Sequence, residues 1–426
     1  MKYLYILAFF CVFVACDKED VEVIEFNESV DYIKQINLYA NSQQLFNDGI
    51  AEIEFLLKVY GDTIVTKVVE GDTLGEYVEV IDTLGYQIAK DRIPNGAIKI
   101  FTEDGEEVTG GKYSTTASAG TVSFYAKAGD VQSDFFTVDI EDKPSVDFDE
   151  ITIPVIFHLI SNVNNKYSIG EIKSENLEEM INNLNQVFEG SLKNAPHSVD
   201  LNVKFQLASQ SEDGRPLKEK GLDRHNVGDA EGKELVAYVN ENTVWDPEKY
   251  LNIWISDWYE DEYGIDWWTL LEYAANRPTY IMGDPLLVPF SNKSWKNMTQ
   301  VDDLYQDWEK VEDIGIVVNT SVLFDTDNEI SFEYIVGKFL GLIPTDFYSN
   351  NSTPLINGDV DFCSDTYLYE VKYPRREKYT VKSDQRVFYW SYNIMDEYSA
   401  STTITYEQAL RIRKVLELCP HRQFRK

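Results

Sequence analysis

Residues 332–344 carry the pattern that most limits how this chain can fold. Apolar side chains recur there at spacings of three and four residues, at Phe332, Ile335, Val336, Phe339, Leu340 and Ile343. This spacing places them along one face of an α-helix, so the segment is predicted to be a helix buried on that face. Gly341 stands where the apolar run ends, as a helix-terminating glycine does. The chain is therefore expected to build a core around this helix.

Length, composition and charge exclude several classes of protein. A chain of 426 residues exceeds one ordinary core, so two or three domains are expected. A hydrophobic content of 43% and an aromatic content of 13% exclude a largely disordered chain. The net charge of −35 argues against nucleic-acid binding, because a phosphate backbone would be repelled, and against a basic membrane-binding patch. The sequence also lacks G-x-S-x-G, P-loop and dinucleotide-binding motifs.

The N-terminal residues are predicted to be a targeting signal that is not part of the folded domains. A charged residue, an apolar run and a small residue before Cys16 predict a signal peptide over residues 1–16, too short to span a membrane. The sequence FVAC at 13–16 resembles a bacterial lipobox, which implies that Cys16 carries lipid. Residues 17–30 are an acidic tether that resembles the surface-export segment of Bacteroidetes lipoproteins. An outer-membrane lipoprotein on the cell surface, in contact with the membrane through its lipid alone, is expected; plain secretion is the alternative.

The cysteines agree with export. Cys11 is lost with the signal peptide and Cys16 is used by the lipid, which leaves Cys363 and Cys419. Two remaining cysteines in an oxidising compartment predict a disulfide. A metal site is the less favoured alternative, since no histidine lies near Cys363 in the sequence.

Residues 31–142 are predicted to form an all-β domain. Alternating apolar residues mark five short strands, at 36–39, 51–56, 97–101, 121–126 and 134–138. Turn signals separate them, as in an antiparallel β-sandwich. The sequence LFNDGIAEIEF resembles a segment of bacterial immunoglobulin-like modules, and this resemblance implies a spacer domain. Residues 141–145 read as a linker.

Residues 147–426 are predicted to form one mixed α+β domain. Apolar runs predict strands at 151–160, 203–208, 250–256 and 314–318. Helical periodicity predicts one helix at 174–188, with Ser174 as its N-cap, and a closing helix at 406–418 capped by Thr405. The predicted helix at 332–344 follows the fourth strand.

Five segments of this domain resemble, in order, the pappalysin-type family of metzincin peptidases. They are the strand at 153–160, the strand at 250–255, the C-S-D-T segment at 363–366, a Met-turn at 393–399 centred on Met395, and the final helix at 404–413. The resemblance covers nearly all of the domain. It implies a metzincin fold with a substrate cleft above the helix at 332–344.

The same resemblance implies that the zinc chemistry of the family has been lost. In the family pattern H-E-x-x-H-x-x-G-x-x-H, three histidines bind zinc and the glutamate is the general base. Gly341 falls on the glycine, whereas the histidine positions hold Tyr334, Lys338 and Pro344 and the glutamate position holds Ile335. Catalytic zinc normally has three protein ligands, so no catalytic residues, no metal and no cofactor are expected.

Other residues have alternative interpretations. Lys338 either replaces the charge of the lost metal, with Asp365, Asp396 or Tyr334 as partner, or is a surface lysine on an amphipathic helix. Residues 325–329 either bind calcium or form a solvated turn, and the turn is favoured. The four histidines show no metal-ligand spacing: the one at 158 is expected in the core, and those at 197 and 225 are expected to be solvated.

The function predicted from these features is binding without catalysis. Trp267, Trp268, Asp365 and Thr366 are the predicted contacts of the cleft with an extended peptide or protein at the cell surface. The protein is thus expected to be a non-catalytic relative of the zinc peptidases. One alternative is an active peptidase or hydrolase with an altered metal site or with carboxylate chemistry. Another is a structural accessory of a surface complex.

Overall fold

A computed structural model describes residues 32–70, 77–163, 169–230, 232–256, 273–274, 311–320, 323, 330–347, 361, 363–366, 369–371, 378–382, 385–389, 392–396 and 402–424. The predicted signal peptide with Cys16, the acidic tether, Trp267, Trp268 and residues 325–329 lie outside the described residues. None of the helices in the described part of the chain is long and apolar enough to cross a membrane.

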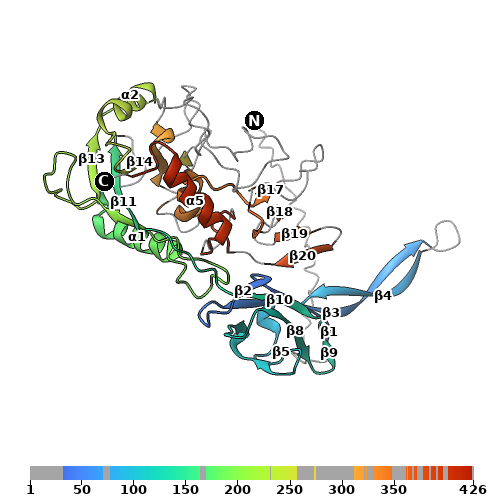
Figure 1. Cartoon of the computed structure of the whole chain (residues 1–426). Coiled ribbons are helices and arrows are strands. Elements are labelled where there is room, and N and C mark those ends of the chain that lie inside the picture. Colours follow the sequence, from blue (N-terminus) through green and yellow to red (C-terminus); the bar gives the residue numbers. More distant parts are fainter. Residues whose placement is uncertain are drawn as a thin grey trace, which may run out of the picture.

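The N-terminal region consists of two β-sheets. One has the order β1-β3-β4, with β7 also paired to β3, from the strands Ile33–Ala40, Ile53–Glu70, Tyr77–Gln87 and Lys112–Tyr113. The other has the order β2-β10-β8-β5-β6, with β9 paired to β8, from Gln44–Phe46, Phe136–Glu141, Gly120–Ala128, Lys99–Thr102, Glu107–Val108 and Val131–Gln132. In Figure 1 these sheets form the lower body, and the outer ends of β3 and β4 extend from it as a two-stranded ribbon.

The two sheets share one core. Residues of β10 alternate between buried and exposed, so Phe136, Val138 and Ile140 face inward. They join Ile36 and Leu38 of β1 in a single apolar cluster. An inward-facing residue at every second position is the pattern of sheets that pack face to face. The predicted all-β character of this region is therefore confirmed within the described residues.

A mainly parallel sheet forms the centre of the following region. Its order is β12-β11-β14-β16-β15, with β13 also paired to β11; of these described strands, β15 is antiparallel to its neighbour and the others pair in parallel. The strands are Val203–Leu207, Ile151–Ser161, Leu251–Ser256, Gly315–Asn319, Tyr273–Ala274 and Leu222–Asn226. Among the described residues, the helices that accompany it are α1 (Ser174–Phe188), α2 (Gly232–Asn242), α4 (Phe332–Phe339) and α5 (Tyr406–Leu418). The predicted combination of helices and strands in this region is therefore confirmed.

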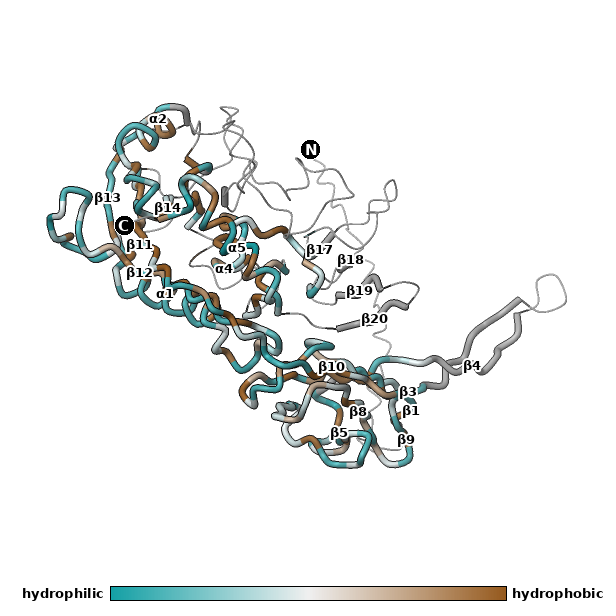
Figure 2. Tube along the Cα trace, in the orientation of Figure 1, coloured by the Kyte–Doolittle hydropathy of each residue, from teal (hydrophilic) through white to brown (hydrophobic). Residues whose placement is uncertain are grey.

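Both faces of the central sheet are covered, and β11 shows this best. Val155, Phe157 and Leu159 pack into the large cluster that contains residues of α1, α4 and α5. Ile156 and Ile160 point to the opposite face, where clusters include residues of α2. Strands buried on both faces read as continuous apolar runs. This is why much of β11 is brown in Figure 2.

Of the two predicted N-cap residues, the structure confirms Thr405 and not Ser174. Thr405 caps α5 as predicted, because its hydroxyl accepts the Gln408 amide while the Gln408 side chain accepts the Thr405 amide. Ser174 is not the N-cap of α1. It is the first helical residue, and its hydroxyl donates to the Lys220 carbonyl at 2.9 Å.

The remaining described strands form a small sheet and the two regions touch. The small sheet has the order β17-β18-β19-β20, from Asp346–Phe347, Tyr369–Val371, Lys378–Lys382 and Gln385–Tyr389. Short 3₁₀ turns lie at Lys90–Arg92, Thr109–Gly111, Ile169–Glu171 and Val311–Asp313. At the junction, the amide of Phe46 donates to the carbonyl of Pro196 at 2.9 Å, and the Phe46 side chain joins the large cluster. The N-terminal sheets thus pack against the central-sheet region through Phe46.

Candidate functional site

Helix α4 is the element around which the candidate site is built. Ser331 caps its first turn, since its hydroxyl accepts the Tyr334 amide at 3.1 Å. At the other end Gly341 has a φ of 90°, a left-handed conformation that favours glycine. The amides of Gly341 and Leu342 return to the carbonyls of Lys338 and Gly337, which is the Schellman arrangement. The predicted helix and its glycine stop are both confirmed.

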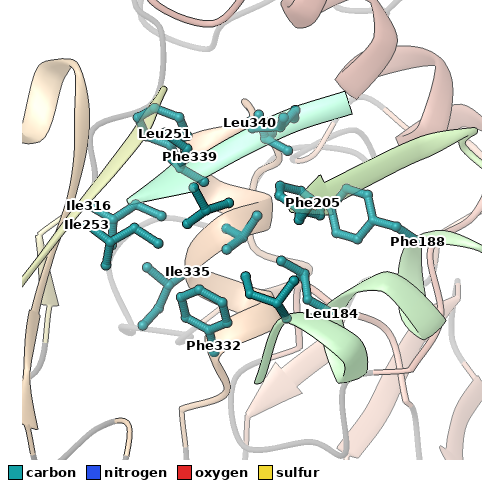
Figure 3. Close-up of a cluster of buried hydrophobic side chains, with 14 of the residues drawn as sticks. Leu184, Phe188, Phe205, Leu251, Ile253, Ile316, Phe332, Ile335, Phe339 and Leu340 are labelled. Carbon is teal, nitrogen blue, oxygen red and sulfur yellow. The ribbon is translucent and has the colours of Figure 1, made fainter. Parts of the chain in front are cut away.

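Two of the four positions matched to the zinc motif are packed into the core. Ile335 is fully buried and Tyr334 is only 6% exposed, and both belong to the large apolar cluster. Figure 3 shows Ile335 and Phe332 directed from α4 into a group of apolar side chains. Lys338 and Pro344 are half-buried. Lys338 is thus neither a fully solvated surface lysine nor a core residue.

A turn carrying Met395 lies directly against α4. Met395 is fully buried, and a Cβ added to Gly337 would lie 2.9 Å from its sulfur. The turn is tied to α5 because the side-chain amides of Asn393 and Gln408 exchange two hydrogen bonds, of 2.9 and 3.0 Å. A side chain at position 337 would therefore require the Met395 side chain to move. The described residues therefore contain a buried methionine turn supporting the helix.

Two buried arginines hold the C-terminal end of α4. The Arg411 guanidinium donates to the carbonyl of Gly341 at 2.5 Å, and that of Arg422 donates to the carbonyl of Phe339 at 3.1 Å. Arg422 also stacks on the Phe339 ring at 3.6 Å. Cations are favourable near a helix C-terminus, where carbonyl groups lack partners within the helix. The C-terminal segment of the chain thus supplies donors to carbonyl groups at the end of α4.

Asp365 and Thr366, predicted as cleft contacts, serve the interior of the structure. Asp365 accepts the Thr405 hydroxyl at 2.7 Å and the Glu407 amide at 2.8 Å, so both of its oxygens bind the first turn of α5. Burial raises the pKa of Asp365 to about 6. The Thr366 hydroxyl is within hydrogen-bond distance of Asp361 and of the Cys363 carbonyl. These contacts give both residues a structural role.

Asp361 is a buried carboxyl group beside them. Burial raises the pKa of Asp361 to about 7, although Thr366, the Cys363 amide and Arg411 act in the opposite direction. A hydroxyl has one proton, so when Thr366 donates to the Cys363 carbonyl, its oxygen can accept a proton from Asp361. The local geometry therefore accommodates the neutral acid.

We expect Asp361→Asn to flatten the pH dependence of stability. The folded-state pKa lies above the unfolded value of 3.8, so the stability contributed by the neutral acid is present at low pH and is lost as pH rises to about 7. Between pH 5 and pH 8 this loss is about 2 to 3 kcal/mol for the parent and absent in the variant. Urea unfolding at the two pH values measures it. Parallel pH profiles for the two proteins would contradict the assignment.

The predicted disulfide between Cys363 and Cys419 is wrong. Both residues are buried free thiols. Cys363 lies beside Asp365, which binds the first turn of α5 at Glu407, whereas Cys419 follows the last residue of that helix. Twelve helical residues span about 18 Å, and a disulfide needs Cα atoms within about 7 Å of each other. Burial also raises the pKa of Cys363, so the thiol is not an activated nucleophile.

A second polar cluster lies on the opposite face of the central sheet, where α2 packs. His158 of β11 is fully buried, with Nδ1 3.2 Å from Asp223 Oδ2 and Nε2 2.9 Å from Asn252 Oδ1. His225 Nε2 is 3.0 Å from the same Asp223 oxygen. Trp245 Nε1 donates to that oxygen at 3.2 Å. Burial acts to raise the pKa of Asp223, but the two histidines outweigh it and hold that pKa well below its ordinary value.

Strand pairing explains this cluster. β11 and β13 are parallel neighbours in which His158 pairs with Asp223 and Ile160 pairs with His225. Side chains two residues apart on a strand share one face, so Asp223 and His225 both face the His158 side. The prediction that the histidine at 158 lies in the core is confirmed. The D-x-H pattern at 223–225, read as part of a strand, was the signal in the sequence that could have indicated the cluster.

The expected solvation of the other two internal histidines is wrong. The His225 side chain is only 13% exposed. His197 lies at the junction with the N-terminal sheets, where its Nδ1 is 3.2 Å from the Ser42 hydroxyl. Burial lowers the pKa of His197 to about 4. Both residues follow polar segments in the sequence, and tertiary packing covers them.

No protein-family model matches the chain, and no curated protein matches it significantly. Among solved structures, it is similar to mature mirolysin of Tannerella forsythia in complex with a cleaved peptide, with a TM-score of 0.42 and 19% identity over 65% of this chain and 96% of that one. It is also similar to a promirolysin mutant of Tannerella forsythia, with a TM-score of 0.41 and 20% identity over 66% of this chain and 85% of that one. These likenesses do not assign the chain to a family.

Proposed function

We propose that residues 147–426 form a pappalysin-like metzincin domain that has lost its zinc and binds an extended peptide or protein without cleaving it. The observation that carries this proposal is the burial of Ile335 and Tyr334 in the apolar core. In the proposed alignment these two residues occupy the general-base position and the first zinc-ligand position. A general base must reach a water molecule near the substrate, and an isoleucine inside a core can neither accept a proton nor meet water.

The other two ligand positions support the loss of zinc. Lys338 is a cation, which repels a metal ion unless it is neutralised, and Pro344 has no donor atom in its side chain. Tyr334 is a poor ligand because a phenol ordinarily loses its proton only near pH 10. Three protein ligands are the usual requirement of catalytic zinc, and this helix offers none that is suitable.

The preserved surroundings of α4 support a retained scaffold. Strands β11, β14 and β16, helix α4, the Met395 turn and helix α5 follow in the order that the sequence resemblance implies. The turn packs on Gly337, and the buried arginines donate to the carbonyl groups of Gly341 and Phe339. These contacts support a folded scaffold around α4, which the proposed binding role requires.

The N-terminal sheets and the N-terminus complete the proposal. The shared core of the two sheets fits an immunoglobulin-like spacer between an anchor and the binding domain. Lipid on Cys16 would hold the protein at the outer membrane, facing the cell exterior. The domain boundaries proposed are 31–142 for the spacer and 147–426 for the binding domain.

Measuring whether the protein binds peptides and whether it cleaves them tests the proposal. We expect an untagged protein comprising residues 17–426, incubated with zinc and a complex peptide mixture, to retain a subset of peptides and to release them intact, as judged by mass spectrometry. The mixture incubated alone is the control for spontaneous hydrolysis. Cleavage that a chelator abolishes, and that persists in the variant His225→Gln of the second cluster, would show that the helix region is catalytic and would overturn the proposal.

A further inference from the structure

We propose that His158, Asp223 and His225 bind one divalent transition-metal ion, with zinc as the best match. Among the described residues, this is the group of three or more His, Cys, Asp or Glu side chains whose ligand atoms all lie within 4.8 Å of one another. It lies on the face of the sheet covered by α2, away from α4, so the proposal does not depend on the proposed loss of zinc from the helix.

The separations of the three ligand atoms suit a small ion. His158 Nδ1 and His225 Nε2 lie 3.2 and 3.0 Å from Asp223 Oδ2. Zinc binds nitrogen and carboxylate oxygen at about 2.0 to 2.1 Å, so two ligands of a tetrahedral site are about 3.3 Å apart. Two edges of such a tetrahedron are therefore nearly formed already. A movement of a few tenths of an ångström completes them.

The hydrogen bonds of His158 leave one ring nitrogen available. Asn252 donates through its amide nitrogen to the carbonyls of Trp245 and Tyr250, so its oxygen is the atom facing His158 Nε2. That Nε2 must therefore carry the proton and donate. In a neutral ring Nδ1 then has a lone pair, which faces a carboxylate oxygen at 3.2 Å and is repelled by it. A cation between the two atoms converts this repulsion into attraction.

The contacts of His225, on the neighbouring strand β13, also favour a bound cation. Its Nε2 is buried and has no hydrogen bond of acceptable geometry, although it lies close to Asp223. Its Nδ1 is 3.4 Å from the hydroxyl of Tyr238, which can accept a proton from that nitrogen. A histidine whose second nitrogen donates to an oxygen is the usual arrangement around a metal. Asn252 and Tyr238 thus play this supporting role for the two rings.

Access and ligand type indicate what the ion is. His158 is fully buried, whereas the side chains of Asp223 and His225 are 29% and 13% exposed, so an ion can enter from their side and keep a water molecule as its fourth ligand. Two imidazoles and one carboxylate suit zinc, and they suit calcium and magnesium poorly because those ions prefer oxygen ligands. The bound ion would join β11 to β13, the short strand beside it.

Metal titration of the untagged, chelator-treated full chain tests this site. We expect one equivalent of Zn²⁺ to bind by isothermal titration calorimetry and to raise the melting temperature, and Co²⁺ to give the visible absorption of a tetrahedral complex. His225→Gln should weaken Zn²⁺ binding by at least about 100-fold, since loss of even a supporting contact costs 10- to 100-fold. His197→Gln is the matched control, because it removes a histidine outside the cluster and should leave affinity unchanged.

The outcomes separate the competing explanations. Failure of the folded parent to bind Zn²⁺ would overturn the proposal. A proton shared between His158 Nδ1 and Asp223 Oδ2, rather than a metal ion, would then join these two atoms. Equal Zn²⁺ affinity in the parent and in His225→Gln would also overturn it and would place the ion elsewhere. Circular dichroism confirms that each variant is folded. Peptide cleavage is not a readout here, so the result is independent of the test of the proposed function.

Discussion

Gly315→Ala is expected to destabilise the protein by about 3 kcal/mol or more, because no space exists for a methyl group at this position. A Cβ at Gly315 would overlap the carbonyl oxygen of Asn252 and would lie 2.5 Å from a ring carbon of Trp254. The carbonyl belongs to the backbone of the neighbouring strand β14, with which Gly315 pairs, so it cannot rotate away. The strands must separate or the fully buried Trp254 must move. Equilibrium unfolding in urea measures the loss.

Gly170→Ala is the matched control for this substitution. No atom lies within 4 Å of a Cβ built there, and its backbone is not in the left-handed region. The free energy of unfolding should therefore change by no more than about 0.5 kcal/mol. Equal effects at the two positions would mean that the close contact of β14 and β16 is not what position 315 requires. Because Trp254 also stacks on His158 at 5.4 Å, we expect Gly315→Ala to weaken metal binding as well.

Arg422→Met is expected to cost about 3 kcal/mol of stability. The Arg422 side chain is 2% exposed and donates to the carbonyls of Phe339 and Asp313 at 3.1 and 2.6 Å. Methionine fills similar space but donates nothing, so two carbonyl groups lose a charged donor in the interior. The contact of the guanidinium with the Phe339 ring is lost too. Urea unfolding of the variant and the parent gives the difference.

Arg215→Met is the control with the same change of side chain. Arg215 is 82% exposed and pairs with Asp213 on the surface, where solvent screening leaves an ion pair with little effect on stability. A loss at Arg422 no larger than the loss at Arg215 would contradict the role assigned to the buried arginine. Arg422→Lys should not restore stability fully, because one ammonium group cannot reproduce the flat fork of a guanidinium.

Local sequence patterns predicted the elements of this protein well. The helix at 332–339, its stop at Gly341 and the capping of α5 by Thr405 all depend on residues within one or two turns of each other. The same holds for the apolar strand β11, whose continuous run follows from burial on both faces. Such features are decided by backbone sterics, short-range hydrogen bonds and the period of side chains along an element.

Long-range pairings were beyond the reach of these patterns. The disulfide was predicted from the number of cysteines alone. The sequence did not show that the length of α5 separates Cys363 from Cys419. The prediction that the histidine at 225 is solvated treated its segment as a connection, whereas it is a strand placed beside His158. In each case the error concerns which residues become neighbours, not what each residue can do.

The sequence by itself determined that α4 would be a buried helix ending at Gly341 and that the residues at its zinc-motif positions would be Tyr334, Ile335, Lys338 and Pro344. Only the tertiary structure decided that Ile335 and Tyr334 fill the core and that His158, Asp223 and His225 converge on the far face of the sheet. The physical reason is that periodicity and chemistry are local properties of a chain. Burial and ligand geometry arise when strands distant in sequence pair in one register.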